Sequence, residues 1–396
     1  MTEPANVEDR PLIVSVNLTT ACNLACTYCH AIHRRESIDD ACVTRVAEGV
    51  GRLTGEPVQI VPFGGEPLVA WPRLRALVEQ SEGHGVRRFM LCTNGLLLDR
   101  PKLEYFMDHD VEVTLSWDGV APAQDALRVY ADGRGTSDEI ERVFDMIRGV
   151  CREPLHMRIT VSPDTAAHFG DSVAYVFDRL GDRPGVKLCF MPVSTAPWSE
   201  VQLASLRSGL RTAAEALVRH RRAGHSVAFA YNECLRAHEL GEQILFSDEP
   251  HGHACLWGVK MLGVDTDGGV YPCHTMIELR GEQREHLCMG NVADGVPDLR
   301  RRLELMPPPE GNPYHACFAW NLVNSGDPFE VPEVYRFLYR AFLEESLRVV
   351  EQLVPAQLAL AEGRAAELLA RAARWDEELR GRPRPSVVNP LGPAVR

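Results

Sequence analysis

The stretch Cys22-Asn-Leu-Ala-Cys26-Thr-Tyr-Cys29 organises the rest of this chain. It directly follows an apolar, β-branched run over residues 11–20, which predicts a buried strand. Three thiols spaced C-x3-C-x2-C on one loop can converge on a single soft metal centre, because thiolates select iron–sulfur clusters, zinc or copper. A structural zinc site needs four ligands, and this loop offers three. The spacing therefore favours an iron–sulfur cluster with one open iron, with a zinc knuckle or three unrelated core cysteines as the alternatives.

The composition is that of a globular protein of the cytoplasm. The chain has 396 residues and a formal net charge of −13, which argues against a surface for nucleic acid or for an anionic membrane. It shows neither a signal-peptide h-region nor a run of about 18 apolar residues that would span a bilayer. Twelve cysteines without a secretion signal indicate a reducing compartment, where cysteine serves metal binding, catalysis or core packing.

Residues 11 to about 195 alternate apolar β-rich runs with helical periodicity, the pattern of repeated βα units around a parallel sheet. Six such units are too few for an eight-fold barrel, so we predict an α/β fold built on a partial (βα)6 TIM-like barrel. Ser37 is expected to cap the first helix, and Thr136 with Glu139 to form a capping box on a later one. The expected strands lie near residues 12–18, 58–63, 88–92, 111–115, 155–162 and 186–191.

Unusual motifs follow four of these strands, at the strand ends where such barrels carry their chemistry. They are the cysteine loop, Gly64-Gly65-Glu66-Pro67, Thr93-Asn94-Gly95 and Ser116-Trp117-Asp118-Gly119. Their shared position at the carboxyl ends of the strands predicts one site.

With these motifs in place, residues 11–195 resemble the radical S-adenosylmethionine (SAM) enzymes. The resemblance implies that Cys22, Cys26 and Cys29 hold a [4Fe–4S] cluster, whose open iron is chelated by the amino and carboxylate groups of SAM. It further implies that the reduced cluster cleaves SAM to a 5′-deoxyadenosyl radical that abstracts hydrogen from the substrate. A one-electron reductant of the flavodoxin or ferredoxin type is the implied partner.

The same resemblance assigns the contacts of SAM. Glu66 and a backbone carbonyl of its turn would receive the SAM ammonium, and Arg128 would pair with the SAM carboxylate in the bidentate manner that suits a guanidinium. Arg158 on the fifth strand would point into the barrel, toward SAM or substrate. An ordinary turn at Gly-Gly-Glu-Pro or Asn-Gly, and a surface position for Arg128, are the alternatives. The full set of implied cofactor contacts is Tyr28, Gly64, Gly65, Glu66, Asn94, Ser116, Asp118 and Arg128.

A second region, residues 236–330, resembles the opening of the SPASM/twitch domain, which binds auxiliary iron–sulfur clusters. Its pattern is a cysteine, a hairpin with Gly-x4-Cys and a Gly-Asn pair, here Cys255, Gly268 to Cys273, and Gly290-Asn291. Asp267-Gly268 also indicates a hairpin turn without any family knowledge.

The pattern departs from a full SPASM domain after Cys317. The positions that should hold the next cysteines carry Trp320, Gly326 and Glu330, so we expect one auxiliary cluster on Cys255, Cys273 and Cys317. Its fourth ligand stays open among Cys234, Cys288, a histidine such as His315, or the substrate.

The resulting organisation is a tail (1–10), a radical SAM partial barrel (11–198), a linking helix and loop (199–235), a SPASM/twitch-like domain (236–330), two helices (331–380) and a disordered tail (381–396). With only ten residues before the first strand, we expect leader-peptide recognition to lie elsewhere in the chain or on another chain.

The resemblance implies a maturase of a ribosomally made precursor peptide, acting by cross-linking, oxidation or epimerisation. Within it, Cys234 is a candidate hydrogen-atom donor and Glu233 a candidate proton acceptor, with Arg158 as a third catalytic candidate. Two other functions stay open: a radical SAM dehydrogenase or epimerase of a small natural-product intermediate, and a non-catalytic zinc-binding protein.

Overall fold

The computed structural model describes residues 11–29, 31, 35–54, 57–151, 155–180, 185–231, 235–236, 261–279, 281–294, 321, 325, 327 and 330–380. Several residues predicted as site residues lie outside these ranges, as do the two predicted tails. They are Glu233, Cys234, Cys255, His315 and Cys317.

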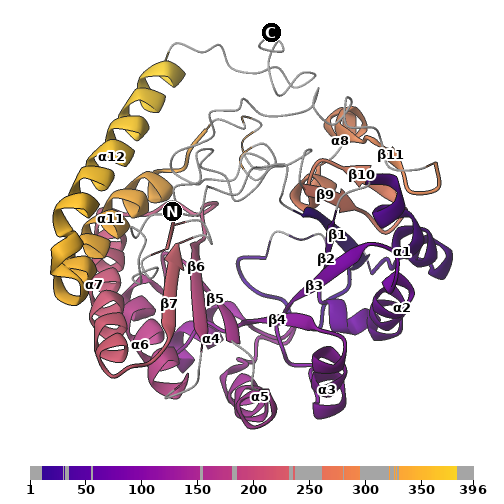
Figure 1. Cartoon of the computed structure of the whole chain (residues 1–396), viewed down its shortest axis with the longest axis horizontal. Helices are drawn as coiled ribbons and strands as arrows, with labels where there is room; N and C mark the ends of the chain where they lie inside the picture. Colours follow the sequence, from indigo (N-terminus) through magenta and orange to yellow (C-terminus); the bar gives the residue numbers. More distant parts are fainter. Residues whose placement is uncertain are drawn as a thin grey trace.

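One sheet runs through the described part of the chain, with the strand order β11-β10-β9-β1-β2-β3-β4-β5-β6-β7-β8 (Figure 1). From β1 to β7 each strand pairs in parallel with the next. These strands are β1 (Leu12–Thr19), β2 (Val58–Gly64), β3 (Val86–Thr93), β4 (Val111–Ser116), β5 (Leu155–Val161), β6 (Val186–Pro192) and β7 (Val227–Tyr231). The short strand β8 (Leu235–Arg236) pairs antiparallel with β7. The predicted partial barrel is confirmed, and β7 is a parallel strand that the sequence analysis missed.

Helices surround the outside of this curved sheet (Figure 1). They are α1 (Asp40–Thr54), α2 (Trp71–Ser81), α3 (Arg100–Asp108), α4 (Ala121–Leu127), α5 (Ser137–Val150), α6 (Phe169–Leu180) and α7 (Glu200–Arg222), followed later by α11 (Glu333–Leu353) and α12 (Leu358–Arg380). The predicted break of the last two helices at Pro355 is confirmed. None of the described helices is both long and apolar enough to cross a lipid bilayer.

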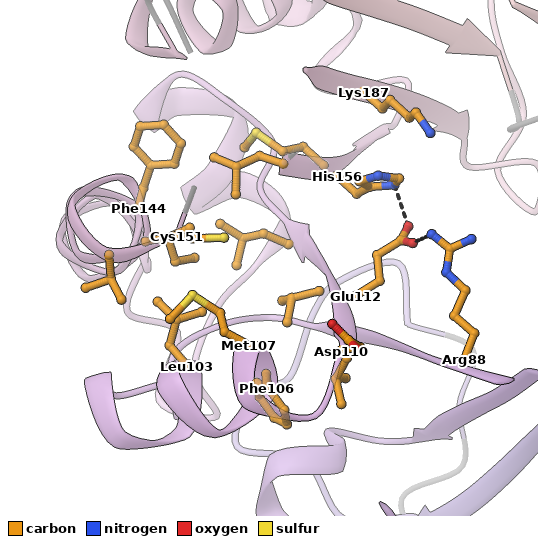
Figure 2. Close-up of a pocket in the computed structure, with 17 residues that line it drawn as sticks. Arg88, Leu103, Phe106, Met107, Asp110, Glu112, Phe144, Cys151, His156 and Lys187 are labelled. Carbon is orange, nitrogen blue, oxygen red and sulfur yellow. Dashed lines mark ion pairs between the residues drawn. The ribbon is translucent and has the colours of Figure 1, made fainter. Parts of the chain in front are cut away.

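Side chains of the strands alternate between a helix-facing apolar layer and a more polar barrel interior. On β5 the odd-numbered residues Leu155 to Val161 are buried, whereas His156, Arg158 and Thr160 between them are half-buried. Figure 2 shows His156 on the side of the strands away from Phe144 of α5. Because strand residues alternate faces, Arg158 and Thr160 share the interior face with His156.

Two predicted helix caps are wrong. At α1 the Cys42 backbone N–H donates to Asp39, 2.6 Å away, while the Ser37 hydroxyl donates instead to Thr19. At α5 the Thr136 side chain makes no cap bond. The Asp125 carboxylate accepts the first backbone N–H groups there instead. In both places a carboxylate replaces the expected hydroxyl, because negative charge gains most from the positive end of a helix.

The region after α7 extends the barrel sheet beyond β1. Strand β9 (Met261–Val264) pairs in parallel with β1, and β10 (Gly269–Tyr271) and β11 (Gly290–Asn291) add antiparallel strands. Gly268 adopts a φ of 82° in the β9–β10 turn, a conformation that favours glycine. The hairpin predicted from Asp-Gly is therefore confirmed. The described helix α8 (Gly281–Leu287) follows β10.

Candidate active site at the carboxyl ends of the strands

The cysteine loop is held by the backbone of the segment that ends α4. The Ala25 N–H donates to the Val129 carbonyl at 2.8 Å, and the Thr27 N–H donates to the Leu127 carbonyl at 2.9 Å. Leu24 anchors the loop in the core, with 5% of its surface exposed. The segment around Arg128 and the cysteine motif, far apart in sequence, are therefore bonded to each other.

The three thiols of this loop lie in different environments. Cys22 and Cys26 are half-buried and Cys29 is exposed. Burial raises the pKa of Cys22 to about 12 and that of Cys26 to about 11, and the charges of the neighbouring cysteines act in the same direction. Three soft donors that repel one another as thiolates suit a polynuclear iron–sulfur cation, which binds them deprotonated. Among the described residues, however, no three histidine, cysteine or acidic side chains are drawn together as a ligand group.

The glycines of Gly64-Gly65-Glu66 allow β2 to pass close to the start of the cysteine loop. A Cβ on Gly64 would lie 2.0 Å from the Thr19 carbonyl oxygen, and one on Gly65 would lie 2.3 Å from that of Ala21. The Gly65 and Glu66 N–H groups donate to the same two carbonyls at 2.8 and 2.9 Å. The two glycines thus let this turn pack directly against the backbone at the start of the cysteine loop.

Glu66 is buried, and its side chain connects its own turn to the end of β3. Its Oε1 accepts the Leu68 N–H at 3.0 Å and the Thr93 hydroxyl at 2.7 Å, and its Oε2 accepts the Asn94 N–H at 2.8 Å. Burial raises the pKa of this carboxyl, against the effect of these hydrogen bonds. A carboxylate has about four acceptor sites, so Oε2 retains capacity for one further donor.

Asn94 links the end of β3 to the cysteine loop. Its Nδ2 donates to Oδ1 of Asn23 at 2.9 Å, and its Oδ1 accepts the Leu96 N–H at 3.0 Å. Asn94 therefore forms an ordinary Asn-Gly turn, which was the alternative to a cofactor contact. Its side chain also contacts the cysteine motif. The sequence analysis missed Asn23, although its place beside Cys22 is a usable signal.

Arg128 is 5% exposed, so a surface position for it is wrong. Its Nε and Nη2 donate to the two oxygens of Asp118 at 2.8 and 3.2 Å, and Asp118 also accepts the Thr160 N–H at 2.7 Å. The guanidinium lies 5.4 Å from the ring centroid of Tyr28 on the cysteine loop. Burial opposes its charge, but the Asp118 carboxylate outweighs burial and raises the pKa of Arg128. The bidentate partner of this arginine in the described chain is thus an internal carboxylate.

Ser116, the last residue of β4, is the register partner of Arg158 in the middle of β5. Ser116 is 8% exposed, and its Oγ lies 3.7 Å from Sγ of Cys92. Arg158 faces the barrel interior with Thr160, whose hydroxyl accepts a 3.4 Å hydrogen bond from Arg128. Arg158 therefore lies on the interior face of β5, and its contact with SAM or substrate stays a prediction.

In the second region, Cys273 follows β10 and is 1% exposed. Cys288 is half-buried, and its Sγ lies 3.4 Å from the Gly290 carbonyl oxygen. The other predicted auxiliary ligands lie outside the described residues, so the auxiliary cluster stays a prediction.

A cavity of about 650 Å³ lies at the opposite end of the strands, away from every motif above. Its apolar walls include Phe106 of α3 and Phe144 of α5. Figure 2 shows Glu112 at its charged side, turned toward both His156 and Arg88, with 2.8 Å between Oε1 of Glu112 and Nδ1 of His156. Since the amino-terminal face of such barrels serves stability, we place the site at the other end.

The part of the chain that forms the barrel is similar to known proteins. Residues 16–176 match the sequence profile of the Radical SAM superfamily. The chain is 27% identical over 206 residues to the serine-type anaerobic sulfatase-maturating enzyme of Klebsiella aerogenes, covering 49% of this chain and 48% of that protein. It is 34% identical over 116 residues to the GTP 3′,8-cyclase of Chlorobaculum tepidum, covering 29% and 33% respectively. The chain spans about half the length, or less, of these curated relatives.

Solved structures show the same architecture. The structure of anSMEcpe with bound AdoMet and Cp18Cys peptide superposes with a TM-score of 0.65 at 18% identity, covering 89% of this chain and 100% of that chain. SuiB of Streptococcus suis, bound to its precursor peptide SuiA, gives a TM-score of 0.50 at 14% identity, covering 69% and 62%. At these identities the likeness concerns the fold alone. Residues 16–176 are thus similar in sequence to the radical SAM superfamily, and the chain shares the fold of these solved structures.

Proposed function

We propose that this chain is a radical SAM enzyme that modifies a peptide, as the maturase of a ribosomally synthesised precursor. The observation that carries the proposal is the convergence of four motifs at one end of the barrel, where the cysteine loop is bonded to Leu127, Val129 and the Gly-Gly-Glu turn. The choice of a peptide is supported by the sulfatase-maturating relative and by the peptides bound in structures of the same fold.

The proposed roles of the residues follow from the site. Cys22, Cys26 and Cys29 hold the [4Fe–4S] cluster, since the donor set and its shared loop fit that group. When bound, the cluster and SAM supply the one-electron reductive cleavage that starts the reaction. Glu66 offers its remaining acceptor site to the cofactor. The buried pair of Asp118 and Arg128 supports the cysteine loop, because the Arg128 guanidinium lies over the ring of Tyr28 on that loop.

Further parts of the proposal rest on the sequence pattern. Residues 236–330 form an auxiliary region that carries one cluster on Cys255, Cys273 and Cys317. Glu233 and Cys234 supply the proton acceptor and the hydrogen-atom donor, and Arg158 faces the substrate. A flavodoxin- or ferredoxin-type protein delivers the electron.

Anaerobic reconstitution tests the metal content. We expect roughly eight irons per chain in the wild type and roughly four in the variant with all three of Cys22, Cys26 and Cys29 changed to Ala. A variant without iron would remove the auxiliary cluster from the proposal. A colourless protein that holds only zinc would overturn the radical reading altogether.

Hydrogen transfer tests the substrate class. With dithionite, SAM and a deuterated candidate precursor peptide, we expect deuterium in the 5′-deoxyadenosine formed and a mass change in the peptide. The triple-cysteine variant is the control and should form none. Deuterium transfer from a small alcohol or sugar, with none from any peptide, would overturn the maturase and favour a small-molecule dehydrogenase.

A further inference from the structure

A buried amide oxygen beside the proposed SAM site has no donor in the described structure. Asn17, on β1, is 3% exposed, and its Nδ2 donates to Oδ1 of Asp265 at 2.9 Å. An ionised carboxylate only accepts hydrogen bonds, so the amide nitrogen must face Asp265 and the amide oxygen must point away from it. That oxygen has no hydrogen-bond partner among the described residues. Such a group is unfavourable unless something supplies a donor.

This oxygen points toward the first glycine of the Gly-Gly-Glu turn. A Cβ built on Gly64 would lie 2.7 Å from Oδ1 of Asn17. The same turn leads into Glu66, whose Oε2 has an acceptor site left. Asn17 Oδ1 on the β1 side and Glu66 Oε2 on the β3 side are thus two acceptors at this one turn, and each can accept a hydrogen bond from a cation with N–H donors.

The orientation of Asn17 is set from outside the barrel. Asp265, which directly follows β9, is 3% exposed and also accepts the Thr266 N–H at 2.7 Å. Arg284 of α8 donates to the other Asp265 oxygen at 2.7 Å and to the Ile277 carbonyl at 2.6 Å. Its guanidinium also lies 4.7 Å from the ring centroid of Tyr271. The second region thus holds a side chain of the first strand in one orientation.

We propose that Oδ1 of Asn17 accepts a hydrogen bond from the amino group of bound SAM, and that Asp265 and Arg284 are positioning residues for it. The inference rests on SAM binding at the proposed site and is independent of whether the substrate is a peptide. The amino group is the cationic donor of SAM, and a cation gains most from an amide oxygen with a carboxylate behind the amide. Changes in the second region therefore alter SAM affinity without touching SAM.

Equilibrium dialysis on the cluster-reconstituted full chain, without any peptide, tests this. We expect Asn17→Leu to weaken SAM binding by about 10- to 100-fold, the range for losing a hydrogen bond to a charged group. The affinity for 5′-methylthioadenosine, which lacks the amino-acid arm, should be unchanged. Gln59→Leu is the matched control, because Gln59 is a buried amide on the neighbouring strand whose Nε2 donates to Sδ of Met90 at 3.1 Å. Its SAM affinity should stay within about twofold of wild type.

Asp265→Asn tests the positioning role and covers the case in which Asn17→Leu fails to fold. It lets the Asn17 amide turn over, so we expect weaker SAM binding with unchanged iron content. Wild-type SAM affinity in both variants would overturn the proposal. An equal loss for SAM and 5′-methylthioadenosine would place the Asn17 contact on the nucleoside and overturn the assignment to the amino group.

Discussion

Replacing Arg128 by Met should destabilise the protein severely, because it leaves the Asp118 carboxylate buried without its cation. Asp118 is 0% exposed and Arg128 is 5% exposed, so solvent screens neither charge. Removing one partner of such a pair typically lowers the free energy of unfolding by about 3–5 kcal/mol. The Thr160 N–H still solvates Asp118 at 2.7 Å, so we expect the lower half of that range. Urea unfolding of the cluster-free chain at pH 7 measures the loss.

The control is Arg100→Met, which removes an exposed helical ion pair with Glu104 and should cause no measurable loss. If uncompensated charge is the cause, the double variant Asp118→Leu/Arg128→Met should recover more than half of the stability lost by Arg128→Met alone. A loss below about 1 kcal/mol for Arg128→Met would refute the reasoning, since that is the value of an ordinary neutral hydrogen bond.

Three further predictions concern this end of the barrel. Gly64→Ala should abolish cluster retention after desalting, because its Cβ would lie 2.0 Å from a backbone oxygen. The control Gly149→Ala places its Cβ in open space on α5 and should leave the iron content unchanged. Equal iron content in the two variants would contradict this. Asp125→Ala should lower the free energy of unfolding by about 1–2 kcal/mol through loss of the α5 cap, without changing the SAM dissociation constant; a changed constant would give Asp125 a binding role. Burial raises the pKa of Glu66 above 4.5, so the folded state holds this proton more tightly than the unfolded state. The stability of wild type relative to Glu66→Gln should therefore be highest below pH 4.5. It should fall as pH rises through the raised pKa. A difference in unfolding free energy that grows with pH would show that its hydrogen bonds outweigh burial.

The strands and helices up to residue 195 were predictable because each carries a local signal, either an apolar run or a helical period. The short run Val227-Ala-Phe-Ala-Tyr231 is apolar and follows Gly224, so it carries a local strand signal that the sequence analysis assigned to a linking loop; it pairs with the edge of β6. The caps at α1 and α5 were mispredicted because the sequence does not show which carboxylate approaches a helix end. Asp125 reaches α5 only through the fold.

Within the site, the positions of Glu66, Asn94 and Arg128 were predictable, but their partners were not. Glu66 satisfies three donors, one from its own turn and two from the end of β3, and Arg128 pairs with Asp118 ten residues earlier. Neither arrangement leaves a trace in spacing, because it depends on how strands stack side by side. Motifs identify which side chains lie in the site, and only the structure shows which of them already have hydrogen-bond or ion-pair partners.

The pairing of β9 with β1 has a consequence for biosynthesis. Asn17 and its partner Asp265 are 248 residues apart, so the ribosome makes most of the chain before the outer edge of the first strand is covered. During that time the outer edge of β1 lies unpaired next to the three thiols, and an unpaired edge is a template for aggregation. This edge is covered only once residues 261–264 have been made and can form β9.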